Sequence, residues 1–209
     1  MTEEVWLTST DPQPMLEYIQ GRASDRKLRL FAVECCRRIW DRIISDSARN
    51  VVEVVERHAD GLASRQDALS AAAEAEGNSF NYDTTTYRAN AAAETLVMVG
   101  NRTRSCQVVA ACAAYAAGDA SEPRIQSELL RHIFGNPFRP VLVDPRWFTS
   151  TAVGLARTVY EECAFDRLPI LADALEEAGC DEPAVLDHCR SDGPHVRGCW
   201  AVDLVLGKE

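Results

Sequence analysis

Apolar residues recur at intervals of three or four along almost the whole chain, which is the spacing of one face of an α-helix. Polar capping residues separate these runs: Ser24 precedes one of them, and Ser64 with Asp67 three residues later approximates a capping box. The pattern predicts an all-α protein, a multi-helix bundle. Its clearest run comprises Leu28, Phe31, Ala32, Cys35, Ile39 and Ile43. Cys36, Trp40 and Ile44 are expected to widen the same buried stripe.

The length of the chain, 209 residues, is enough for one domain with a well-buried core. Residues 134–148, FGNPFRPVLVDPRWF, contain three prolines and are not expected to form a regular helix. We therefore predict a single helical domain over 1–209. Within it, an N-terminal bundle (1–133) is joined by this proline-broken crossing loop (134–148) to a C-terminal helical layer (149–209). The sequence also predicts a polar loop over 78–87 and a helix boundary at Gly100–Asn101.

The net charge of −10 and the pI near 4.9 argue against a nucleic acid as partner, because phosphate binding depends on clustered Lys and Arg. The basic residues in 22–42 are expected to meet acidic groups of the same protein instead. We expect no membrane association and a cytoplasmic location, since the sequence has no run of eighteen apolar residues and no signal-peptide pattern. In that reducing compartment the eight cysteines are predicted to be thiols or metal ligands.

The stretch HCRSDGPHVRGCW, residues 188–200, holds two histidines and two cysteines. If a helix begins at Pro194, then His195, Cys199 and Asp203 form one ridge on it. Zinc prefers nitrogen and sulfur ligands in a tetrahedron. The stretch therefore suggests a zinc site formed by Cys189, His195 and Cys199, with His188 or Cys180 as the fourth ligand.

Two other interpretations of this stretch stay open. Cys189 follows Val185 and Leu186 by four and three residues, a position where a small core residue belongs. A Cys–His enzyme would use Cys199 as nucleophile, His195 as base and Asp203 to orient the base, but no oxyanion hole accompanies them. We therefore expect a protein without enzymatic activity.

Two further histidines, His58 and His132, lie near the C-terminal ends of predicted helices, where a partly charged imidazole is favourable. The proline-broken loop presents Phe138 and Arg139, residue types that anchor protein interfaces. The alternative is that Phe138 fills the bundle and Arg139 pairs with an acid. Together these features predict a non-enzymatic helical module that binds a protein partner, with a zinc-stabilised helical protein as the alternative.

The segment PAVLDHCRSDGPHVRGCWAVDLVLG, residues 183–207, loosely resembles a HEAT-like helical hairpin: a short helix, an Asp-Gly-Pro turn and a second helix. The phrases SDRKLRLFAVECCRRIW, IFGNPFRPVLVDPRW and AFDRLPILADALEEAGC are similar to those of an uncharacterised paralogous protein family of planctomycete bacteria. This resemblance spans about residues 1–60 and 121–209. It implies no activity, substrate or catalytic residue, whereas the HEAT-like resemblance implies a helical hairpin at the C-terminus.

Overall fold

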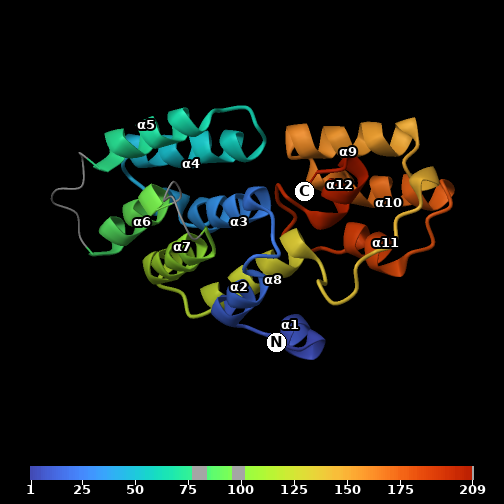
Figure 1. Ribbon diagram of the computed structural model, residues 1–209, viewed down its shortest axis with the longest axis horizontal. Coiled ribbons are helices and arrows are strands. Elements are labelled where there is room, and N and C mark those ends of the chain that lie inside the picture. The colour runs from blue at the N-terminus through green and yellow to red at the C-terminus, as the bar shows by residue number, and fades with distance from the viewer. Residues whose placement is uncertain (77–83, 96–101, 209) are drawn as a thin grey trace. The chain divides into compact units, whose positions relative to one another are not determined.

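The computed structural model describes residues 1–76, 84–95 and 102–208. Within these ranges the regular elements are twelve α-helices and three 3₁₀ helices, with no strand (Figure 1). The predicted all-α fold is therefore confirmed. Among the described residues no helix is both long enough and apolar enough to span a bilayer.

The chain divides into two compact units, Met1–Leu130 and Arg131–Glu209. The division falls three residues before the predicted end of the N-terminal bundle, inside a helix rather than at its end. That the two units form a single domain stays a prediction. The first unit contains α1 (Glu3–Thr8), α2 (Pro12–Ile19), α3 (Asp25–Arg37), η1 (Trp40–Arg42), α4 (Asp46–Ala59), α5 (Arg65–Glu76), α6 (Thr84–Thr95), α7 (Arg102–Ala117) and the start of α8 (Glu122–Phe134).

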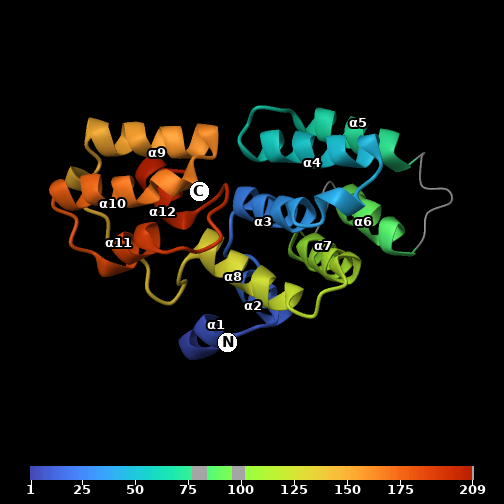
Figure 2. The same cartoon turned by 180° about the vertical axis from the view of Figure 1, so that it is seen from behind.

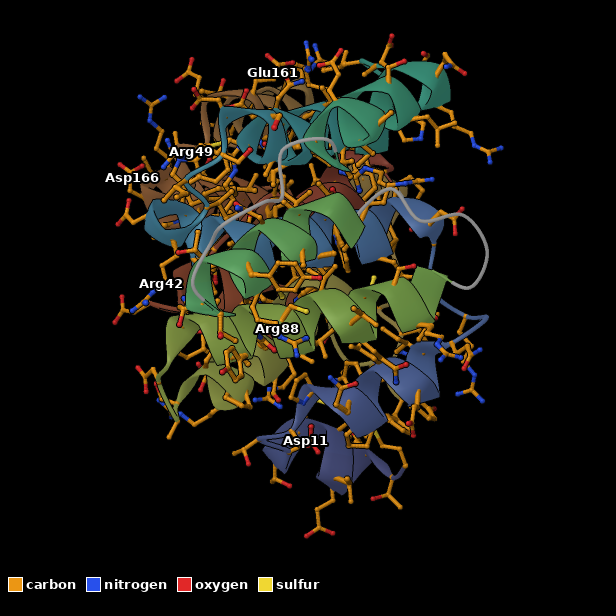
Figure 3. The ribbon with its side chains drawn as sticks, turned by 90° about the vertical axis from the view of Figure 1, so that its left-hand side faces the viewer. Asp11, Arg42, Arg49, Arg88, Glu161 and Asp166 are labelled. Atoms are coloured by element: carbon orange, nitrogen blue, oxygen red, sulfur yellow. The ribbon has the colours of Figure 1, made fainter. Side chains whose placement is uncertain are left out.

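Helix α3 is the centre of the first unit, since it packs against α4, α6 and α7 (Figure 1). The predicted apolar run is buried, and so is Cys36, whereas Trp40 is half-buried and Ile44 is 53% exposed. The helix ends at Arg37 and a 3₁₀ turn follows, so Ile39, Ile43 and Ile44 do not continue its helical face, and only the first two point into the core. On the outside of the unit, the guanidinium of Arg88 on α6 lies 5.6 Å from the ring centroid of Tyr115 on α7 (Figure 3).

Helix ends in the first unit follow their capping residues. The Ser24 hydroxyl accepts a hydrogen bond from the Lys27 amide at the start of α3. At the start of α5, the Ser64 amide donates to the Asp67 carboxylate (2.7 Å) and the Asp67 amide donates to the Ser64 hydroxyl (3.1 Å), so the predicted capping box is confirmed. The polar loop predicted over 78–87 is wrong for 84–87, which open α6. Its remainder and the Gly100–Asn101 boundary lie outside the described residues.

Four arginines of the basic region pair with acids of the same unit: Arg29 with Asp25 along α3, Arg26 with Asp60, Arg37 with Glu56, and Arg38 with Glu122. The last pair is bidentate, with both N–O distances at 2.8 Å, and connects the end of α3 to the start of α8. The Glu122 side chain is only 4% exposed. The charge of this carboxylate is therefore shielded little by water, and its loss of the Arg38 partner would cost more free energy than at a surface carboxylate.

The second unit contains residues 131–134 of α8, then η2 (Pro145–Trp147), α9 (Ser150–Glu162), η3 (Phe165–Arg167), α10 (Leu168–Glu177), α11 (Pro183–Arg190) and α12 (Trp200–Leu206). Helix α9 packs against α10 and α12, and α11 packs against α10 and α12 (Figure 2). Their core includes Ala156, Leu171, Leu175 and Val202, each at most 1% exposed. Between α8 and η2, the proline-broken residues 135–144 form no regular helix, as predicted.

The C-terminal hairpin differs from the prediction in one respect. The first helix, α11, ends at Arg190 as expected, but the second begins at Trp200 with Cys199 as its N-cap, and not at Pro194. The reason is local: Gly198 has φ +86°, a left-handed conformation that a continuing helix does not tolerate. The predicted helical ridge of His195, Cys199 and Asp203 is therefore wrong. The resemblance to a HEAT-like repeat stays a prediction.

We predict that Glu122→Gln lowers the free energy of unfolding by about 2 kcal/mol, because it removes the charge that the Arg38 guanidinium faces in a largely buried pair. The matched control is Glu128→Gln on the same helix, where the exposed pair with Arg124 is worth about 0.3–0.5 kcal/mol. Urea unfolding of both variants measures the difference. Equal losses would contradict this role for the Arg38–Glu122 pair.

Candidate metal centre

Four side chains with metal-binding atoms converge in the second unit: His132, His188, His195 and Cys199. One ligand atom from each lies within 4.8 Å of the corresponding atom of every other. Three of the four histidines in the protein are therefore gathered in one place. Such a concentration of nitrogen and sulfur donors is the composition that zinc prefers.

Each donor is placed by a short stretch of local structure. His132 lies in the last turn of α8, and His188 lies in the last turn of α11. His195 belongs to the irregular segment 191–199, and Cys199 is the N-cap of α12. The donors thus come from the ends of three helices and from one connecting segment, which no single helical repeat in the sequence would bring together.

Two donor pairs already stand near the separation that a metal ion imposes. His195 Nδ1 lies 3.1 Å from His132 Nε2, and His188 Nε2 lies 3.2 Å from Cys199 Sγ. Bond lengths of about 2.0–2.1 Å for Zn–N and 2.3 Å for Zn–S give tetrahedral edges of about 3.3 Å between nitrogens and about 3.6 Å between nitrogen and sulfur. An ion would thus need each of these pairs to open by only a few tenths of an ångström.

A backbone carbonyl selects the tautomer of His195. The Nε2 atom of this ring lies 2.8 Å from the Ser191 carbonyl oxygen, which can only accept a hydrogen bond. Nε2 therefore carries the proton and donates a hydrogen bond to the carbonyl, and Nδ1 presents its lone pair toward His132. A hydrogen bond of this kind from the outer nitrogen is what orients most metal-binding histidines in proteins.

The histidines at the buried side of the cluster are held neutral. Burial lowers the pKa of His132 to about 2, and the neighbouring His188 and His195 contribute in the same direction. Burial, followed by the effect of His195, lowers the pKa of His188 to about 3. Metal ions bind neutral imidazole, so both rings are in the binding form at neutral pH. The expectation that His132 is partly charged at a helix end is therefore wrong, since the ring is only 5% exposed.

The structure separates the two cysteines of the 188–200 stretch. Cys199 belongs to the four-donor group and Cys189 does not, although both are buried in the apolar core of the second unit. Burial raises the pKa of the Cys189 thiol to about 12. Cys180, considered as a fourth ligand, is also in that core and outside the group. His188, the other candidate for the fourth position, lies within the group.

The sequence did not indicate His132 as a member of this donor group. It precedes His188 by 56 residues, and no characteristic spacing relates the two. The only local signal is its position three residues before Gly135, which ends α8 with φ +66°. A histidine in a last helical turn is common for electrostatic reasons alone, so this signal does not indicate a ligand.

The other candidate residues lie elsewhere in the second unit. Phe138 is half-buried and Arg139 is exposed, and both amides donate hydrogen bonds to Asn136, which shapes this turn after α8. For the Cys–His enzyme, Cys199 Sγ lies 3.2 Å from His188 Nε2 and within 4.8 Å of a ring nitrogen of the proposed base His195. Asp203 is buried at 1% exposure, on α12, where the ridge that would have aligned it with His195 does not exist.

No family model, curated protein or solved structure matches the chain. The resemblance to the planctomycete family therefore stays a prediction.

We predict opposite neutral tautomers for two histidines of the metal-free protein. His195 should carry its proton on Nε2, which faces the Ser191 carbonyl, and His58 should carry it on Nδ1, which lies 2.9 Å from the Ala63 carbonyl oxygen. Long-range ¹H–¹⁵N correlation spectra of the imidazole rings at about pH 8 distinguish the two forms. Nδ1 protonation of His195 would contradict the orientation of its lone pair toward the cluster.

Proposed function

We propose that the protein is a zinc-stabilised helical protein in which His132, His188, His195 and Cys199 hold the ion. The convergence of these four donor atoms within 4.8 Å carries the proposal. Of the residues first considered from the sequence, His195, Cys199 and His188 are retained, His132 is added, and Cys189 and Cys180 take the role of core residues.

The donor set favours zinc over the hard cations. Calcium and magnesium take oxygen ligands, whereas three imidazoles and one thiolate suit zinc. Copper binds to similar ligands and generally binds a given site more tightly than zinc does. The test therefore includes the identity of the metal ion in protein purified from cells. Four protein ligands fill a tetrahedral zinc ion and leave no position for a substrate. This supports a structural ion and a protein without enzymatic activity.

The ion would stabilise a part of the second unit that has no regular secondary structure. Segment 191–199 forms local backbone hydrogen bonds, from His195 to Gly193 and from Cys199 to Val196. These bonds close turns, and Arg197 attaches the segment to the end of α9 by donating to the Glu161 carbonyl and to Cys163 Sγ. An ion bound by His195 and Cys199 in the segment, and by His132 and His188 on helices, would attach it at two further points. Metal binding would then contribute directly to the folding free energy.

The protein-interaction role is the second candidate, and one observation favours it. Leu142, in the same proline-broken loop as Phe138 and Arg139, is 88% exposed. The next residue, Val143, is 39% exposed, and adjacent exposed apolar side chains flanked by polar residues such as Arg139 and Asp144 are what a contact surface would present. The two roles are compatible, since a structural ion would hold the unit from which this loop emerges.

We predict that the purified protein contains about one equivalent of zinc and that ligand substitutions remove it. His132→Ala and Cys199→Ala should each weaken zinc binding at least about 100-fold, because each deletes a bond to the ion. Metal analysis of the protein and competition with a chromophoric chelator measure content and affinity.

The matched controls are the residues of the same type outside the group. His58→Ala removes the fourth histidine, and Cys189→Ala removes an equally buried thiol, so both variants should keep the ion. A zinc content below about a tenth of an equivalent in the wild-type protein, with no zinc uptake on titration, would end the proposal. Loss of zinc in Cys189→Ala but not in Cys199→Ala would overturn the ligand assignment.

A further inference from the structure

The end of α8 makes an unusually close contact with Trp200. Gly135 follows the helix with φ +66°, and its amide donates a 2.8 Å hydrogen bond to the Arg131 carbonyl. A Cβ atom at this position would lie 3.2 Å from Trp200 Cγ, 3.3 Å from Cδ2 and 3.5 Å from Cδ1. The indole ring therefore packs directly on the glycine backbone, at a distance where an added Cβ atom would require the ring to move by a few tenths of an ångström.

The same indole contacts a ligand of the candidate metal centre. The ring centroids of Trp200 and His188 are 5.0 Å apart, with the planes inclined by 52°. Trp200 is also the residue next to Cys199, another ligand, and Gly135 follows the third ligand, His132, by three residues. One side chain thus contacts His188 on α11 and the end of α8, and is bonded through the backbone to the N-cap of α12.

We infer that Trp200, seated on Gly135, is the positioning residue of the metal centre. This inference rests on the proposed zinc function. A metal site requires its ligands to be held within about 0.5 Å of the productive geometry by neighbours that fix their side chains. The indole contact restricts the His188 ring, and the Gly135–Trp200 contact sets the distance between the helix end that carries His132 and the backbone that carries Cys199.

Glycine at position 135 therefore meets two separate demands. The left-handed φ favours glycine at the end of any helix, at a cost of about 1 kcal/mol for other residues. The contact with Trp200 is particular to this position. Gly207 is the matched control, because it follows α12 in the same unit with a similar φ of +63°, and a Cβ atom added there would have no neighbour within 4 Å. Alanine at position 207 therefore has the conformational cost of the left-handed φ without a steric contact.

The test compares zinc affinities of Gly135→Ala and Gly207→Ala, each alone and combined with Trp200→Ala, by chelator competition on protein whose helix content is checked by circular dichroism. We expect Gly135→Ala to weaken zinc binding at least about 10-fold more than Gly207→Ala. In the Trp200→Ala background the two glycine substitutions should have equal effects, since the indole that meets the new methyl group is gone. Cobalt(II) absorption should show an altered ligand field in Gly135→Ala and an unaltered one in Gly207→Ala.

Equal zinc affinity and equal cobalt spectra for the two glycine variants, with zinc bound by the wild type, would overturn this inference and leave the proposed function standing. If Gly135→Ala does not fold, Trp200→Ala is compared with Trp147→Ala, which removes an indole from the same unit's core. Wild-type affinity in Trp200→Ala would then overturn the inference. A wild-type protein that binds no zinc would overturn the proposed function and this inference together.

Discussion

Two imidazole nitrogens, His195 Nδ1 and His132 Nε2, lie 3.1 Å apart, and the candidate centre depends on this contact more than on any other. It joins an irregular segment to the last turn of a helix more than sixty residues earlier. Because the Ser191 carbonyl accepts a hydrogen bond from the Nε2–H group of His195, Nδ1 of the same neutral ring carries no proton and must act as a hydrogen-bond acceptor. In the metal-free protein the His132 Nε2–H group donates to it. In the metal-bound protein the ion would take the place of that proton.

The cluster is costly without a compensating group. Gathering three imidazoles removes them from water, and their mutual repulsion opposes protonation of any one, so the pKa values of His132 and His188 fall far below the ordinary range. A folded protein gains little by burying such rings where leucine or valine would pack. The desolvation that disfavours a proton leaves neutral nitrogen donors, and a divalent ion bound by them would recover the cost. For this physical reason we favour a metal centre over a cluster of buried polar side chains that binds no ion.

Much of the fold follows from residue patterns that act locally. The stripe on α3 and the Ser64–Asp67 capping box were predictable because each depends on neighbours within one or two turns. The start of α12 was not, because Gly198 adopts φ +86° and turns the chain where apolar periodicity favoured a helix from Pro194. Likewise, the sequence could suggest His188, His195 and Cys199 from their proximity along the chain. His132 reaches the group only through the packing of the second unit, which no spacing encodes.

X-ray absorption at the zinc edge of the purified protein tests the central claim most directly. A centre formed by His132, His188, His195 and Cys199 predicts four-coordinate zinc with three nitrogen ligands at about 2.0–2.1 Å, showing imidazole scattering, and one sulfur at about 2.3 Å. Two or more sulfur ligands would return Cys189 or Cys180 to the ligand set. A shell of oxygen ligands with no sulfur would contradict the centre altogether.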